Sequence, residues 1–310
     1  MQKKAIVTGA NGFIGSHVCA VLARRGVRVY AVVKDENEPA DALRAMEHVT
    51  VVCCDMNSIS RLEHLIDDRD VDVFYHFAWA GSAGMARSDE ALQMQNVQAT
   101  VAALRTADRM GCRKFVCAGS IMEQETIAAV YAQDTKPGAA YVYGAAKVAA
   151  RTLCRPIAGS LSIELCWAVI TNAYGPGEVS PRFVNTTIRK ILAGDPLRFT
   201  AATQNYDFVY IDDAARAFAA IGDYGKPNRE YVIGSGEAKP LREFILELCR
   251  TLAPQAECIF GDIPFTGVNL PLEAYAIDAL WEDCGFAPEV PFAEGAARTM
   301  VWLQNQQERI

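Results

Sequence analysis

The 310-residue chain lacks the features that define several large classes of protein. No apolar run approaches the roughly 18 residues of a membrane span. The first apolar run begins so close to Met1 that we expect no signal peptide. No cluster of lysine and arginine offsets the net charge of -7. We therefore expect a cytoplasmic protein with no membrane and no nucleic-acid partner.

Metal-ligating patterns are also missing. The four histidines show no metal-ligand spacing, and the ten cysteines include no C-x-x-C pair. Cys53 and Cys54 are adjacent on a predicted strand, so they face opposite sides and do not share a metal. We predict no metal site, and cysteines of this kind are typical of a reducing compartment. His76 lies on a predicted buried strand and is interpreted as a hydrogen-bonded core residue.

A glycine-rich turn follows the first apolar run. Gly9 and Gly12 lie between residues 5–7 and a predicted amphipathic helix that begins at Phe13, and Gly15 lies in the first turn of that helix. Gly9 can take the positive φ of a tight turn, Gly12 lets the backbone approach a pyrophosphate, and Gly15 lets the helix pack on the sheet. The helix start then faces the anion. The pattern predicts a dinucleotide site with further contacts from Asn11, Phe13 and Ile14.

Tyr143 and Lys147 are four residues apart, so they share one face of a predicted helix. An ammonium beside a phenol favours the phenolate, which makes a tyrosine usable as an acid or base nearer neutrality than its usual value of about 10. Ser120 ends a predicted strand, where its hydroxyl can reach the same substrate oxygen. We predict that these three residues are catalytic. The alternative is a tyrosine and a lysine on a solvated helix surface.

Short apolar runs alternate with amphipathic stretches up to about residue 170. Such runs are typical of buried strands in a parallel sheet covered by helices. We predict an α/β fold, with a Rossmann-type doubly wound sheet in residues 1–170 and a smaller, mainly substrate-binding α/β domain in residues 171–310. The predicted strands span residues 5–7, 27–33, 49–54, 71–78, 114–119 and 163–170, and the longest predicted helix spans residues 89–110.

With these motifs the chain resembles the extended short-chain dehydrogenase/reductases, in the branch that acts on nucleotide sugars. The glycines and the Ser120, Tyr143 and Lys147 trio match that family, as do Asn172–Pro176 and Phe208–Asp213. The resemblance implies NAD or NADP as cofactor and a nucleotide-sugar substrate. It also implies further cofactor contacts from Asp55, Met56, Phe77, Ala78 and Asn96.

The resemblance also implies an arrangement for the second half of the chain. About residues 206–233 are expected to return to the nucleotide domain, while the remainder forms a small lid over the sugar. In the family, the helices that correspond to residues 89–110 and 142–157 pair across a two-fold axis. We therefore expect a homodimer.

Two positions after Ser120 bear on the reaction. Sugar 4,6-dehydratases of this family carry an Asp-Glu pair there, whereas this chain has Ile121 and Met122, which cannot transfer protons; Glu123 follows. The stretch looks like that of deoxysugar 4-keto reductases, so we predict a 4-keto-sugar reductase that uses reversible hydride transfer. The alternatives are an NAD-dependent nucleotide-sugar 4-epimerase and a non-catalytic dinucleotide-binding redox sensor.

The end of the second predicted strand bears on the cofactor. An NAD enzyme usually carries an acid there, which binds the ribose 2′-hydroxyl. This chain has Val33 followed by Lys34, and a lysine attracts the 2′-phosphate of NADP. We therefore favour NADP, while Asp35 leaves NAD as the alternative.

The substrate site departs from the family at one cation. Many members have an arginine just before the Asp-Phe-Val run, where it pairs with the pyrophosphate, but this chain has Tyr206. The anion must then be bound by other groups, such as Arg182, Arg198 or Lys190. We predict substrate contacts at Trp79, Arg87, Thr171, Asn172 and Arg182.

Overall fold

The computed structural model describes residues 2–133 and 136–307. Its larger half contains a seven-stranded sheet in the order β11-β6-β5-β4-β1-β2-β3, and every neighbouring pair is parallel. The predicted doubly wound α/β fold is confirmed, and the predicted strands are found within two residues at each end. The strands are β1 (Lys4–Thr8), β2 (Arg28–Val33), β3 (Val49–Cys53), β4 (Val73–His76), β5 (Lys114–Ser120), β6 (Glu164–Ile170) and β11 (Arg229–Ile233).

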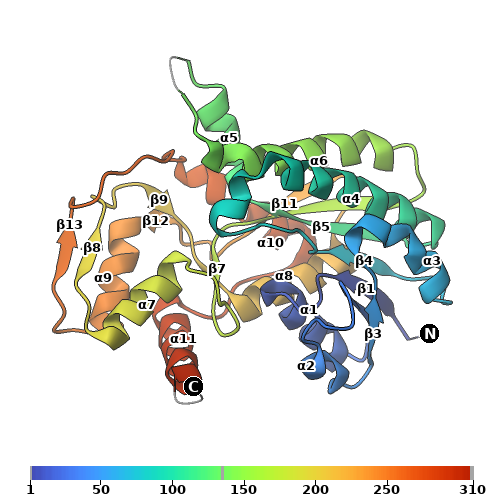
Figure 1. Cartoon of the computed structure of the whole chain (residues 1–310), viewed down its shortest axis with the longest axis horizontal. Coiled ribbons are helices and arrows are strands. Elements are labelled where there is room, and N and C mark those ends of the chain that lie inside the picture. The colour runs from blue at the N-terminus through green and yellow to red at the C-terminus, as the bar shows by residue number, and fades with distance from the viewer. Residues whose placement is uncertain (1, 134–135, 308–310) are drawn as a thin grey trace.

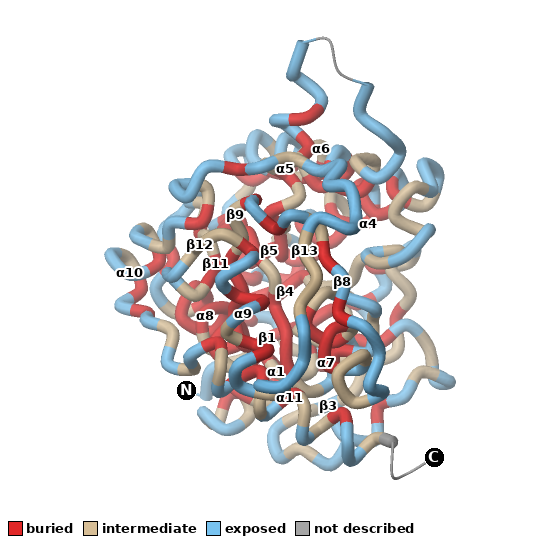
Figure 2. The backbone as a smooth tube through the Cα atoms, turned by 90° about the vertical axis from the view of Figure 1, so that its left-hand side faces the viewer, coloured by how far each residue is buried: buried red, intermediate tan, exposed pale blue. Residues whose placement is uncertain are grey.

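Helices cover both faces of this sheet (Figure 1). Crossovers between parallel strands place helices on each face, which is why the strands are apolar along nearly their whole length. Figure 2 shows the resulting buried backbone through the middle of the molecule. One face packs against α1 (Phe13–Arg24), α2 (Asp41–Arg44), α8 (Ile211–Tyr224) and α10 (Asp278–Cys284), and the other against α3 (Leu62–Leu65), α4 (Glu90–Arg109) and α6 (Val142–Ala158).

The smaller half has an aromatic core of its own. Phe208, Phe244 and Phe292 lie in contact there, with ring centres 4.9–5.3 Å apart. Its helices are α7 (Phe183–Ala193), α9 (Leu241–Leu252) and α11 (Phe292–Gln307). Its short strand pairs are β8 (Leu197–Phe199) with β13 (Cys258–Phe260), β9 (Asn205–Tyr206) with β12 (Lys239–Pro240), and β7 (Ala173–Tyr174) with β10 (Val209–Tyr210).

Two late segments pack on the larger half. The strand β11 extends the central sheet beside β6, and α8 lies on the same face as α1. The short helix α10 also belongs to this core through Leu280, and it lies in the stretch of residues 272–284. The structure divides that stretch into a 3-10 helix, η4 (Leu272–Tyr275), and α10, because the apolar side of α10 packs against α8 and β11.

No helix in residues 2–133 and 136–307 is both long and apolar enough to cross a membrane. Within the same residues, no three His, Cys, Asp or Glu side chains are grouped to hold a metal ion. His76 is a hydrogen-bonded core residue, as predicted, with Nδ1 2.9 Å from Thr8 Oγ1 and Nε2 3.3 Å from Thr100 Oγ1. Burial, and then the charge of Lys147, lowers the pKa of His76 to about 3.

Gly222 allows α8 to lie directly on the sheet. A Cβ at this position would be 1.8 Å from Tyr75 Oη, and Tyr75 is itself buried. We expect Gly222→Ala to lower the free energy of unfolding by about 1–3 kcal/mol through overpacking, although alanine is the better helix former.

Urea unfolding measures this effect, and Gly159→Ala is the matched control. At Gly159 a Cβ meets nothing closer than 3.5 Å, and φ is -63°. The control should unfold at the wild-type urea concentration or above it. Equal stability of the two variants would contradict the packing argument.

Candidate active site

The glycines of this turn allow neighbouring backbone segments to approach each other closely. Gly9 has φ +64°, and a Cβ there would lie 2.8 Å from Ala78 N. A Cβ at Gly15 would lie 2.2 Å from Gly9 O. Helix α1 starts at Phe13, directly after Gly12, with no side-chain cap and no acid in its first turn. Its first N–H groups therefore remain free for an anion, which fits the pyrophosphate of a dinucleotide.

The turn forms one wall of a cavity of about 290 Å³ at the carboxyl ends of β1, β4 and β5. Ligands of open parallel sheets bind at this edge, where the strand order reverses. The structure brings together here most of the residues predicted to contact cofactor and all three predicted catalytic residues. They are Gly9, Asn11, Gly12, Phe13, Ile14, Gly15, Phe77, Ala78, Ser120, Tyr143 and Lys147.

Four residues predicted to contact cofactor do not line this cavity. Lys34 is exposed beyond the end of β2. Asp55 caps a 3-10 helix, η1 (Met56–Arg61), and Met56 packs against the core under α4. Asn96 is used by the fold: its Oδ1 accepts the Ala80 N–H at 2.9 Å and its Nδ2 donates to Ala80 O at 2.8 Å. Asn96 thereby fixes the loop after β4, which forms a wall of the cavity.

Glu38 is a neighbour of the glycine turn that the sequence analysis missed. Asn11 Nδ2 donates to Glu38 Oε2 at 2.9 Å. Glu38 follows β2 by five positions, later than the position where the sequence pattern places an acid. The sequence does show this acid in the loop after the second strand. Only the folded structure shows that the loop brings it to the glycine turn.

Lys147 occupies a confined position behind Tyr143 on α6. It is 5% exposed, and its Nζ donates to Ala118 O at 2.9 Å. The same Nζ lies 3.6 Å from the ring centre of Trp79 and 5.9 Å from that of Tyr143. Trp79, which was predicted to contact substrate, lines the cavity beside the glycine turn and packs against the Lys147 and Tyr143 side chains. Its ring face stabilises the ammonium by a cation–π interaction.

Ser120 is held by a buried acid three residues later. The Ser120 N–H donates to Glu123 Oε1 at 2.9 Å, and Trp167 Nε1 donates to the same oxygen at 3.0 Å. The other oxygen lies 3.3 Å from Arg151 Nε. Burial raises the pKa of Glu123, and the Arg151 charge partly opposes this shift. Glu123 is fully buried, and its carboxylate faces the protein interior.

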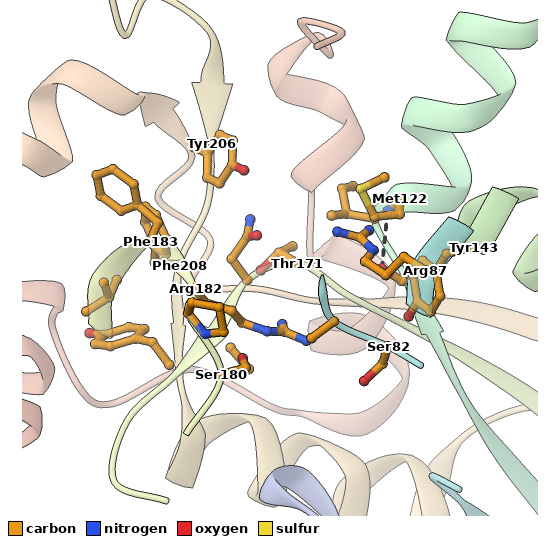
Figure 3. Close-up of a pocket in the computed structure, with 18 of the residues that line it drawn as sticks. Ser82, Arg87, Met122, Tyr143, Thr171, Ser180, Arg182, Phe183, Tyr206 and Phe208 are labelled. Carbon is orange, nitrogen blue, oxygen red and sulfur yellow. Dashed lines mark hydrogen bonds between the residues drawn. The ribbon is translucent and has the colours of Figure 1, made fainter. Parts of the chain in front are cut away.

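A second cavity, of about 260 Å³, opens on the other side of Ser120 and Tyr143. In Figure 3, Tyr143 and Arg87 lie on one side of it, and Phe183, Tyr206 and Phe208 on the other. The Arg87 guanidinium carbon is 4.8 Å from the Tyr143 ring centre. Of the residues predicted to contact substrate, Arg87, Thr171, Asn172 and Arg182 line this cavity. Arg198 and Lys190 do not, and Arg198 pairs with Asp262.

Asp207 anchors the far wall of the second cavity and was missed as an organising residue. It is fully buried, and its Oδ2 accepts Thr171 Oγ1 at 2.7 Å and the Ser235 N–H at 2.9 Å. The Asn172 side-chain amide donates to Asp207 O at 3.0 Å. Burial raises the pKa of Asp207, and these hydrogen bonds oppose the shift. Thr171 and Asn172 are therefore held in place by the fold itself.

The fold and this arrangement of glycines, serine, tyrosine and lysine define a dinucleotide-binding enzyme of the short-chain dehydrogenase/reductase class. Residues 5–234 match the NAD dependent epimerase/dehydratase family. The chain belongs to that family, as the sequence resemblance predicted.

Known relatives span nearly the whole chain. A UDP-N-acetyl-alpha-D-glucosaminuronate decarboxylase of Bacillus cytotoxicus is 27% identical over 338 residues, covering 98% of this chain and 99% of that protein. A dTDP-D-glucose 4,6-dehydratase of Mus musculus is 23% identical over 332 residues, covering 98% of this chain and 89% of that protein. These proteins act differently, so family membership leaves the net reaction open.

Solved structures share the fold. A UDP-N-acetylglucosamine 4-epimerase from Methanobrevibacter ruminantium, in complex with UDP-N-acetylmuramic acid, has a TM-score of 0.81 at 18% identity and covers 98% of this chain and 99% of that one. The Bordetella bronchiseptica enzyme WbmF, in complex with NADH, has a TM-score of 0.80 at 19% identity. The match covers 99% of this chain and 94% of that one.

Removing the Glu123 acceptor tests its support of Ser120. Glu123→Leu leaves the Ser120 N–H and the Trp167 indole N–H buried without an acceptor, so we expect a loss of about 2–5 kcal/mol in the free energy of unfolding. Glu123→Gln retains one acceptor oxygen and should lose clearly less. Chemical denaturation of both variants measures the difference, and identical stabilities would show that these hydrogen bonds are not the reason for burying the acid.

Proposed function

We propose that this protein is an NAD-dependent enzyme that oxidises and reduces a carbon of a nucleotide-activated sugar. The observation that carries the proposal is the position of Ser120 and Tyr143, which line both cavities. A dinucleotide held at the glycine turn and a sugar held in the second cavity would meet there. Several relatives are named for nucleotide sugars, which supports this substrate class.

The side chains divide the chemistry between them. Tyr143 takes the proton from a sugar hydroxyl during oxidation and returns it to the carbonyl oxygen during reduction. Ser120 hydrogen-bonds that oxygen, and the buried ammonium of Lys147 stabilises negative charge nearby. When bound in the first cavity, the dinucleotide supplies the hydride acceptor and donor.

The cofactor proposal differs from the preference for NADP in the sequence analysis. Lys34, on which that preference rests, is exposed and lines neither cavity. Glu38 instead bonds Asn11 in the glycine turn. A carboxylate beside this turn repels a 2′-phosphate and can accept a ribose hydroxyl, so it favours NAD. Neighbouring structures solved with NAD or NADH support the same choice.

For the net reaction, we propose 4-epimerisation first. An epimerase regenerates its cofactor in each cycle, which suits a retained NAD, and several solved structures of this fold are 4-epimerases. The 4-keto-sugar reductase favoured by the sequence remains the second candidate. We do not propose dehydration, because Ile121 and Met122 replace the acid and base, and Glu123 points into the interior.

We also propose a homodimer in the cytoplasm. Helices α4 and α6 lie side by side and expose Met94 and Leu153, which a two-fold contact would cover. All ten cysteines are free thiols, which suits a reducing compartment.

Replacing the proposed acid and base tests the mechanism. Tyr143→Phe removes the proton-carrying hydroxyl but keeps the ring, so we expect turnover of a UDP- and dTDP-hexose panel to fall about 100-fold or more. Dinucleotide affinity should remain near wild type. Product formation is followed by NMR, with the exposed Tyr131→Phe as matched control. Undiminished turnover in the Tyr143 variant would refute the assignment.

The dinucleotide carried by the purified protein tests the net reaction. Native mass spectrometry of the full chain should find NAD retained after gel filtration, because an epimerase keeps its cofactor. Weak retention with a clear preference for added NADPH over NADH would instead favour the reductase and refute the cofactor proposal.

A further inference from the structure

Glu125 places a carboxyl group in the second cavity that the mechanism above does not use. It lies on α5 (Met122–Val130), one turn beyond Ser120 and Met122. In the described part of the chain, no hydrogen bond and no ion pair within 4.0 Å engages this carboxyl group. Glu123, two residues earlier, has its carboxylate occupied by Ser120, Trp167 and Arg151. Glu125 alone of the two is available to a ligand.

The surroundings of Glu125 are polar and contain one nearby cation. Burial raises the pKa of Glu125, and the charge of Arg87 opposes the shift. Burial is the largest cause that raises the pKa of Tyr206 to about 12, and the charge of Glu125 is the second largest. It also raises the pKa values of Tyr141 and Tyr275. The half-buried carboxyl group lines the same cavity as Arg87 and Tyr206, and its charge acts on three phenols.

Neither arginine of the cavity, Arg87 or Arg182, forms an ion pair with Glu125. Arg182 pairs with Glu178, their Nε and Oε2 atoms lying 3.3 Å apart. Arg87 lies over the Tyr143 ring, and its buried Nε has no hydrogen-bond partner in the described chain. Tyr206 adds no positive charge at the position where the family often has arginine. A ligand carboxylate placed next to Glu125 would be repelled, whereas a hydroxyl or an ammonium would donate a hydrogen bond.

We propose that Glu125 accepts a hydrogen bond from a hydroxyl or ammonium group of the sugar, and so selects neutral or amino sugars over sugar carboxylates. This inference rests on the proposed function, in which the second cavity holds the sugar.

Calorimetric titration of the NAD-saturated full chain tests the proposal. The probes are UDP-glucose, dTDP-glucose, UDP-glucosamine and UDP-glucuronate. Wild-type protein should bind glucose or glucosamine conjugates about tenfold or more tightly than UDP-glucuronate, the scale of one hydrogen bond to a charged group. Tighter binding of UDP-glucosamine than of UDP-glucose would identify the donor as ammonium, and equal binding would identify a hydroxyl.

Glu125→Gln removes the charge and retains the shape. It should reduce the preference against UDP-glucuronate to less than about threefold, because the repulsion disappears while Arg87 remains in the cavity. The matched control is Glu257→Gln, a loss of one charge at an exposed position between α9 and β13. That control should keep the wild-type ratio. Thermal unfolding of both variants checks that they are folded.

The outcomes separate this inference from the function beneath it. A wild-type protein that binds NAD but none of the four sugar probes would overturn the proposed function, and the inference with it. Equal wild-type affinity for glucose and glucuronate conjugates would overturn the inference alone. So would an unchanged ratio in a folded Glu125→Gln protein.

Discussion

The active site depends on a buried positive charge. A buried ammonium is costly unless it is paired, and Lys147 meets Ala118 O and the Trp79 ring. Because Ala118 stands two residues before Ser120 on β5, this contact fixes α6 against the strand that ends in the serine. Tyr143 lies one turn earlier on α6 and so reaches the same wall. Gly144 permits the approach, since a Cβ there would lie 2.5 Å from Met122 O.

Two buried carboxylates hold the walls on either side of this charge. Glu123 joins the end of β5 to β6 and α6, and Asp207 joins the residues that follow β6 and β11. Each acid is surrounded by donors, which is the condition for burying such a group. Both are therefore structural. Glu125 differs from these two acids, because it lines the second cavity and has no such donors. It is the acid that we propose to contact the substrate.

The two cavities differ in much of their lining. The glycine turn and the ends of β1, β4 and β5 form the first cavity, and local backbone geometry largely determines them. Segments from both halves of the chain form the second, including Arg87, Glu125 and Tyr206. Residues on such segments can change without disturbing the sheet.

Local patterns in the sequence determined the fold class, the strands, the glycine turn and the Tyr143 and Lys147 pair. Each depends on the period of a helix or strand, or on the conformational freedom of glycine within a few residues. Tertiary structure decided the partners that are distant in sequence. It turned Asn96 to the Ala80 backbone, placed Trp79 under Lys147, left Lys34 exposed and brought Glu38 to Asn11. Such contacts depend on how separate segments pack, and no local period encodes them.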